Sequence, residues 1–147
     1  MITGPGQAGL VSLDEAARAV ADLVGGFAPI EAFEDVGYLS GRLRAAADVP
    51  VSIIADPPTT VFDAALLVDV LVHAAERIAT AAHAVDPRAD DWRAWDPEIA
   101  FLGGRAWSVR FESAPGGGEL GLLIQLEGTE VTLVDRLDEL DDDPVLG

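Results

Sequence analysis

The stretch EIAFLGGRAWSVRF, residues 98–111, shows the pattern that decides the fold. Apolar side chains alternate with polar or small ones on both sides of Gly103-Gly104, as in two half-buried strands joined by a tight turn. The alternation returns in LGLLIQLEGTEVTLV, residues 120–134, around a second turn at 127–129. We therefore predict a four-stranded antiparallel meander over residues 98–136, with one apolar face.

The chain before this meander has mainly helical periodicity. Ser12 and Glu15 have the spacing of a capping box, and apolar residues then recur every three or four positions. This pattern predicts a first helix over 13–24, which Gly25-Gly26 would end. A second helix is expected over 30–47 and a third, the longest and most apolar, over 61–85.

Two local signals lie between the second and third helices. The segment 51–55 is short, β-branched and bounded by prolines, which predicts a strand. Thr59 or Thr60 is expected to cap the third helix, with Asp63 complementing the positive end of the helix dipole.

Together these elements predict an α+β fold in which N-terminal helices and one long apolar helix pack on a C-terminal four-stranded antiparallel β-meander. The apolar face of the meander needs a cover, and the helix at 61–85 is apolar enough to supply it. We expect one domain over 1–147, with a loose lead-in at 1–11 and an acidic tail at 137–147.

Composition excludes several classes of function. The chain has 147 residues, with 26 acidic and nine basic side chains, a net charge of −17 and no cysteine. This charge repels nucleic-acid phosphates and anionic lipids, and the missing cysteines exclude disulfides and thiolate metal sites. The N-terminus lacks the basic and apolar runs of a signal peptide, and the longest apolar stretch, 61–75, contains Asp63, Asp69 and His73. We expect a cytoplasmic protein that binds neither nucleic acid nor membranes.

The excess of negative charge favours a basic protein as the partner. Two acid-rich stretches are the candidate binding residues, and the first also contains two tryptophans that could anchor a partner. The alternatives are that both indoles seal one end of the core and that the acids only confer solubility. The candidate partner-binding residues are Asp86, Asp90, Asp91, Trp92, Trp95, Asp96, Asp138, Glu139, Asp141 and Asp142.

A polar stripe on the longest predicted helix supports a different hypothesis. Asp69, His73 and Glu76 recur at helical spacing, and Thr80 and His83 continue the same line. Two carboxylates and an imidazole could hold a metal ion, or a carboxylate could orient His73 as a base. The alternative is that the stripe is the solvent-facing edge of a covered helix. The direction in which His73 points distinguishes these interpretations.

These observations favour a non-enzymatic acidic binding protein that engages a basic protein partner, in an immunity- or inhibitor-like role and without a cofactor. One alternative is a small metal-dependent or ligand-binding enzyme that uses the polar stripe. Another is a secretion chaperone or an oligomer subunit, including a homodimer formed through the outer sheet face or the terminal strand.

Overall fold

A computed structural model of the chain describes residues 10–29, 37–44, 46–55, 60–89, 92–114 and 121–136. These residues form strands, helices and one short 3-10 helix, η1. The elements in chain order are β1 (Leu10–Val11), α1 (Leu13–Ala19), β2 (Val24–Pro29), β3 (Gly37–Leu43), β4 (Ala46–Ala55), β5 (Phe62–Asp63), α2 (Ala64–Val72), α3 (Ala74–Val85), η1 (Trp92–Trp95), β6 (Pro97–Gly103), β7 (Ala106–Phe111), β8 (Leu122–Glu127) and β9 (Glu130–Arg136).

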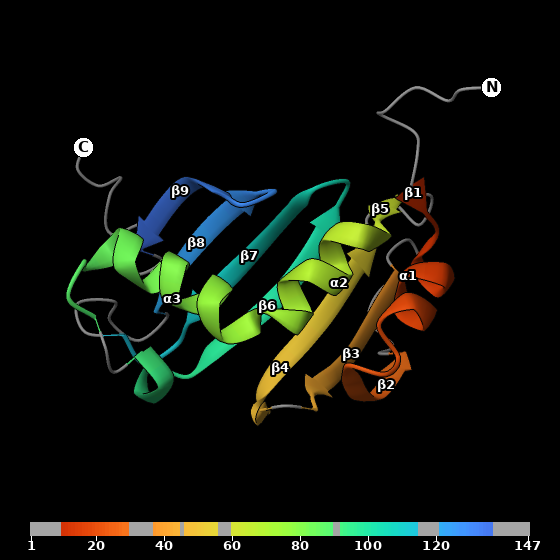
Figure 1. Cartoon of the computed structure of the whole chain (residues 1–147), viewed down its shortest axis with the longest axis horizontal. Helices are drawn as coiled ribbons and strands as arrows, with labels where there is room; N and C mark the ends of the chain where they lie inside the picture. Colours follow the sequence, from red (N-terminus) through yellow and green to blue (C-terminus); the bar gives the residue numbers. More distant parts are fainter. Residues whose placement is uncertain are drawn as a thin grey trace, which may run out of the picture.

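A mixed sheet of seven strands, in the order β2-β3-β4-β6-β7-β8-β9, forms the centre of the fold (Figure 1). Every neighbouring pair is antiparallel except β4 and β6, which run parallel. A parallel pair needs a long crossover, and here the chain between the two strands contains β5, α2, α3 and η1. The short strands β1 and β5 pair separately.

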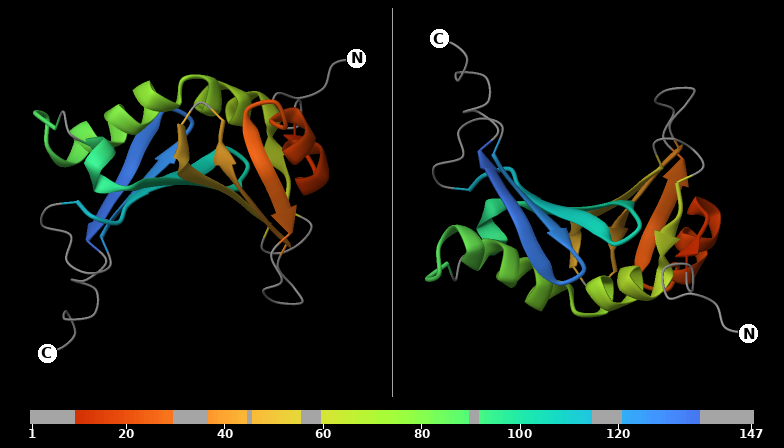
Figure 2. Two further views of the ribbon diagram at one scale, coloured as in Figure 1. Left: turned by 90° about the horizontal axis from the view of Figure 1, so that it is seen from below. Right: turned by 90° about the horizontal axis from the view of Figure 1, so that it is seen from above.

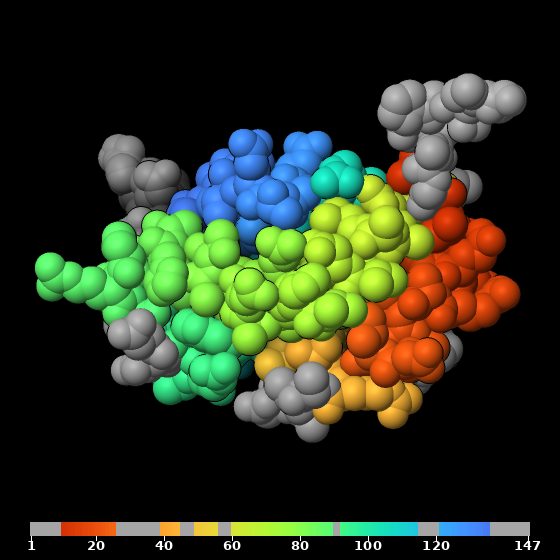
Figure 3. Space-filling view, in the orientation of Figure 1, coloured from red at the N-terminus to blue at the C-terminus, as the bar shows by residue number. Residues whose placement is uncertain are grey.

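The helices cover one face of this sheet. Figure 2 shows the sheet bent into an arch, with α2 and α3 across its convex side. The space-filling view in Figure 3 shows α2 and α3 as a continuous layer between the C-terminal strands and the N-terminal part of the chain. In the part of the chain that the structure describes, no helix covers the concave side. The fold therefore has two layers and one open sheet face.

The core lies between the convex side of the sheet and the helices. The alternating residues of β6, β7 and β8 are buried there, as their period of two predicts. From the helices, Leu67 and Ile78 are each 1% exposed and pack into the same core. The largest fully buried side chains are Trp107, Phe62, Phe101, Phe111, Ile53, Leu67, Ile78, Ile99, Leu122, Ile124, Val20 and Val51.

The predicted fold class is wrong about the size and kind of the sheet. Strands β6 to β9 pair antiparallel in chain order, but they are only four strands of a seven-stranded mixed sheet. The helix predicted over 30–47 is also wrong, because its second half belongs to β3 and the start of β4. Val49, Val51 and Ile53 point alternately into the core, and β4 pairs with β3 on one side and with β6 on the other. Pairing of distant segments overrides the local helix preference of the alanines near residue 46.

The first helix is shorter than predicted. The capping box is confirmed, with Glu15 N–H donating to Ser12 Oγ and Ser12 N–H to Glu15 Oε1, both at 3.3 Å. Helix α1 ends at Ala19, however, and the Gly25-Gly26 pair expected to end it lies inside β2. Burial of Val24, which is 2% exposed, draws this segment into the sheet edge.

The single long apolar helix is also wrong, because the segment forms two helices that break at His73. His73 has φ −108° and ψ 35°, outside the helical region. A straight helix over 61–85 would be roughly 37 Å long, at about 1.5 Å per residue. Two shorter helices instead follow the bend of the sheet (Figure 2). No described helix has the length and apolar character needed to cross a bilayer.

The cap of α2 is Asp63, whereas the sequence pointed to Thr59 or Thr60. Thr59 lies outside the described residues, and the helix begins only at Ala64. The Asp63 carboxylate accepts a hydrogen bond from Leu66 N–H at 3.1 Å. It also forms an ion pair with Arg105 Nη1 at 2.7 Å. One side chain thus caps the helix and ties it to the β6–β7 turn.

We expect Asp63→Ala to lower the free energy of unfolding by about 1–2 kcal/mol, because the helix loses its cap and Arg105 its partner. Asp63→Asn keeps a good capping group and should lose only about 0.5 kcal/mol. Urea denaturation monitored by circular dichroism measures both changes. Asp22→Ala, at an exposed carboxylate, is the control. Equal losses for the alanine and asparagine variants would assign the effect to the ion pair alone.

Candidate functional site

The strand register sets residues that adjoin the two predicted acidic stretches at the same end of the sheet. Pro97 at the start of β6 pairs with Phe111 at the end of β7, which pairs with Leu122 at the start of β8. Leu122 in turn pairs with Arg136 at the end of β9. Because neighbouring strands lie about 4.8 Å apart, the start of β6 and the end of β9 are separated by roughly 15 Å. We call this end of the sheet the acidic end.

Some of the predicted partner-binding acids lie within the structure and others do not. Asp86, which follows α3, and Asp96, which precedes β6, are both exposed. The described carboxylates at this end also include Glu98, Glu112 and Asp135, which sequence reasoning did not select. The remaining predicted acids, Asp90, Asp91, Asp138, Glu139, Asp141 and Asp142, lie outside the described residues.

The charge is distributed unevenly along the chain. The described segments contain all nine arginines and 14 of the 26 acids, a net charge of −5. The other 12 acids, and no basic residue, belong to the remaining segments. Eight of them belong to the segments 90–91, 115–120 and 137–147, which adjoin elements that begin or end at the acidic end.

Asp96 also has a structural role. Its φ is 58°, which is rare for a residue other than glycine and better tolerated by aspartate than by most residues. Ser113 Oγ donates a hydrogen bond to Asp96 Oδ2 at 2.5 Å, and Ser113 N–H donates to the Trp95 carbonyl at 2.9 Å. These bonds connect the segment before β6 to the segment after β7, so Asp96 shapes the acidic end as well as adding charge.

The two predicted anchor tryptophans are buried. Trp92 is 8% exposed and Trp95 is 9% exposed, which leaves little indole surface for a partner. Trp95 packs edge-on against Phe111, with ring centroids 5.2 Å apart and an interplanar angle of 89°. Arg93 stacks over the Trp92 ring at 4.4 Å. Both indoles therefore pack at one end of the core.

The polar stripe is only partly assembled. Asp69 Oδ1 lies 3.2 Å from His73 Nδ1, while Asp69 Oδ2 pairs with Arg77 Nη2 at 2.6 Å. Arg77 was not part of the sequence hypothesis, and it neutralises the carboxylate that a metal would need. The His73 side chain is 47% exposed, and Glu76 is exposed and forms no ion pair among the described residues. Within those residues, no three groups of the metal-binding types are placed to hold an ion.

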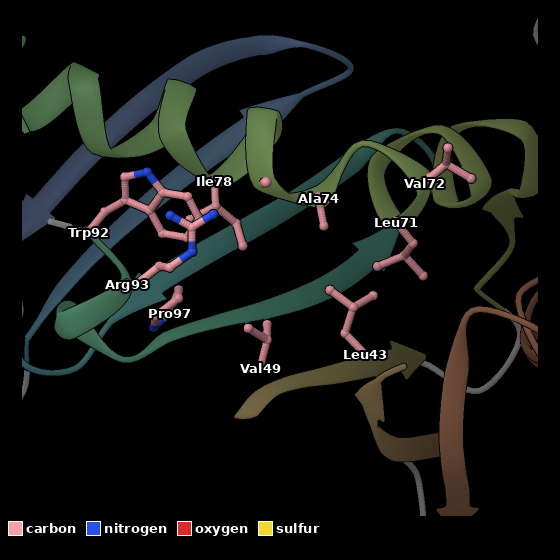
Figure 4. A pocket seen from close by; sticks show the side chains of 10 residues that line it. Leu43, Val49, Leu71, Val72, Ala74, Ile78, Trp92, Arg93 and Pro97 are labelled. Carbon is pink, nitrogen blue, oxygen red and sulfur yellow. The ribbon is translucent and has the colours of Figure 1, made fainter. Parts of the chain in front are cut away.

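An apolar groove lies beside the acidic end, where sequence reasoning did not expect a site (Figure 4). Its volume is about 260 Å³, and it runs under the break between α2 and α3. No local pattern could signal it, because six separate elements contribute the side chains. The lining residues are Leu43, Val49, Leu71, Val72, Ala74, Ala75, Ile78, Trp92, Arg93 and Pro97.

The open sheet face has a row of mostly small side chains at its centre. The register aligns one residue from each strand from β3 to β9, so the row crosses nearly the whole sheet. Beside it, Arg110 Nη1 lies 3.6 Å from Glu98 Oε2. The members of the row are Ser40, Ser52, Ala100, Ser108, Gln125 and Leu133.

The described elements define a two-layer α+β protein, with one mixed sheet covered by helices on a single face. No protein-family model, curated protein or solved structure matches the chain significantly.

Proposed function

We propose that this chain is a non-enzymatic acidic binding protein that engages a basic protein partner through the acidic end, in an immunity- or inhibitor-like role. The observation that supports the proposal is the strand register, which sets Pro97 and Arg136 at the same end of the sheet. The acid-rich stretches that adjoin these two residues are distant in sequence.

The arrangement of charge supports this site over the rest of the molecule. A surface of one sign steers an oppositely charged partner and raises association rates by about 10–1,000-fold. Arginines at the acidic end are partly engaged, since Arg93 stacks on Trp92 and Arg110 lies beside Glu98. The carboxylates described there, Asp86, Asp96, Glu98, Glu112 and Asp135, outnumber these two cations and Arg136.

The test compares two variants that carry the same change in net charge. Asp138→Asn, Glu139→Gln, Asp141→Asn and Asp142→Asn together remove four charges from the segment that follows β9. The control removes four charges from the segments 30–36 and 56–59, which adjoin the opposite end of the sheet, by Glu31→Gln, Glu34→Gln, Asp35→Asn and Asp56→Asn.

Each chain serves as bait in lysate of the source organism, and a captured basic protein is then purified and titrated by calorimetry. We expect the Kd of the tail variant to be at least about tenfold weaker than that of the natural chain, and that of the control to be within about threefold. The Kd of the natural chain should also weaken steeply from about 50 to 300 mM salt, because screening shortens the reach of charges. A partner that is not basic, or one that binds both variants equally, contradicts the proposal.

A further inference from the structure

The groove beside η1 is an apolar surface that the helices leave uncovered. Helix α2 ends at Val72 and α3 begins at Ala74, so the helix layer breaks directly over the groove. Leu71 and Ile78, which flank the break, are buried, but Val72 at the rim is 55% exposed. A concave surface with mostly apolar walls and few polar groups is typical of a ligand site.

A single charged side chain, Arg93, lines this groove. Its guanidinium stacks on the Trp92 ring at 4.4 Å, which holds the cation at one end of the groove (Figure 4). Among the residues that the structure describes, no carboxylate lies within 4.0 Å of it, although three other arginines have such partners. The groove thus combines an apolar wall with an oriented cation that no described acid neutralises.

We propose that this groove binds an apolar monocarboxylate of about eight to ten carbon atoms, with its carboxylate on Arg93 and its hydrocarbon chain along Ile78 and Val72. A guanidinium presents a planar fork that matches a carboxylate with two parallel hydrogen bonds. An apolar cavity of about 150 Å³ is known to accept benzene, so a groove of about 260 Å³ suits a chain of this size.

The charge of Arg93 decides between classes of ligand. An amine would be repelled by the guanidinium, and an alcohol of the same length could not form the charged pair with it. The groove therefore differs in preference from the acidic end, which would attract cations. The proposal does not rest on the basic partner, because it concerns the groove beside the acidic end and a ligand of opposite charge.

The probes are octanoate and 1-octanol, which share the same chain length and differ in charge. Methyl-selective NMR follows Val72 and Ile78 in the groove and Val134, an exposed residue of β9, as the remote reference. We expect octanoate to bind with a Kd on the order of 0.5 mM and to shift the groove methyls only. Octanol should bind at least about fivefold more weakly, because it lacks the charged contact.

Two pairs of variants locate the site. Arg93→Gln should weaken octanoate binding about tenfold and leave octanol unchanged, whereas Arg88→Gln, at an exposed arginine outside the groove, should change neither. Ala75→Phe should block both probes by filling the groove, whereas Ala84→Phe, at an exposed position elsewhere on α3, should not.

Equal affinity of the natural chain for the two probes would overturn the proposal, as would unchanged octanoate binding by Arg93→Gln. Shifts at Val134 in place of the groove methyls would also overturn it. Circular dichroism establishes that each variant is folded. If Ala75→Phe proves unstable, the comparison of Arg93→Gln with Arg88→Gln still tests the proposal, because both substitutions change exposed side chains.

Discussion

Gly121→Ala should lower the free energy of unfolding by about 3–4 kcal/mol, one of the two largest effects expected of a single substitution here. Gly121 is buried just before β8 with φ +84°, a region that alanine adopts only at a penalty. An alanine Cβ would also collide with the Phe111 carbonyl oxygen and lie 2.8 Å from Glu112 Cα. These are backbone atoms, and they cannot move without disturbing the pairing of Phe111 with Leu122.

Gly104→Ala is the matched control for this prediction. Gly104 also has positive φ, +54°, but no atom lies within 4 Å of the position its Cβ would take. This substitution should therefore lose only about 1–2 kcal/mol, the conformational penalty alone. Urea denaturation of both variants measures the difference. Equal losses for the two variants would contradict the prediction. They would mean that contact of the new methyl group with the end of β7 does not destabilise the fold.

Trp107→Ala should lower the free energy of unfolding by about 4 kcal/mol. Trp107 is fully buried in β7 and packs near Phe101, with ring centroids 6.2 Å apart. Its Nε1–H donates a hydrogen bond to the Gly128 carbonyl at 2.7 Å, which ties β7 to the β8–β9 turn. The alanine variant leaves both a cavity and an unsatisfied carbonyl, and each is destabilising.

A second substitution at the same position separates the two contributions. Trp107→Phe keeps most of the apolar volume but removes the donor, so we expect a loss of about 2 kcal/mol. Leu102→Ala on β6, where the side chain is 39% exposed, is the control and should lose less than about 1 kcal/mol. Thermal and urea unfolding report all three changes. A Trp107→Phe variant as stable as the natural chain would show that the bond to Gly128 adds nothing to stability.

Local spacing predicted several features of this fold correctly. The capping box at Ser12 and Glu15 needs only two residues three positions apart, and both of its hydrogen bonds are present. The alternation around Trp107 identified the buried face of β7, because side chains of a strand point to opposite sides whatever its partner is. Such features depend on neighbours in sequence.

Other features depended on segments that are distant in sequence. Residues near Gly41 form β3 and not the predicted helix because they pair with the distant strand β4, and the parallel contact of β4 with β6 requires the whole crossover. The break at His73 likewise follows the bend of the sheet, which no single segment specifies. Local periodicity therefore overestimated the helices.

Some features of the candidate site likewise follow from the sequence alone, and others exist only in the folded structure. Net charge and the acidic runs belong to the sequence by itself, and they predict that this chain attracts cations and repels phosphates. Only the tertiary structure decided that Pro97 and Arg136 share one end of the sheet, that Trp92 and Trp95 are buried, and that Arg93 lines an apolar groove. The physical reason is that charge and periodicity belong to a segment, whereas register, burial and cavities exist only between segments.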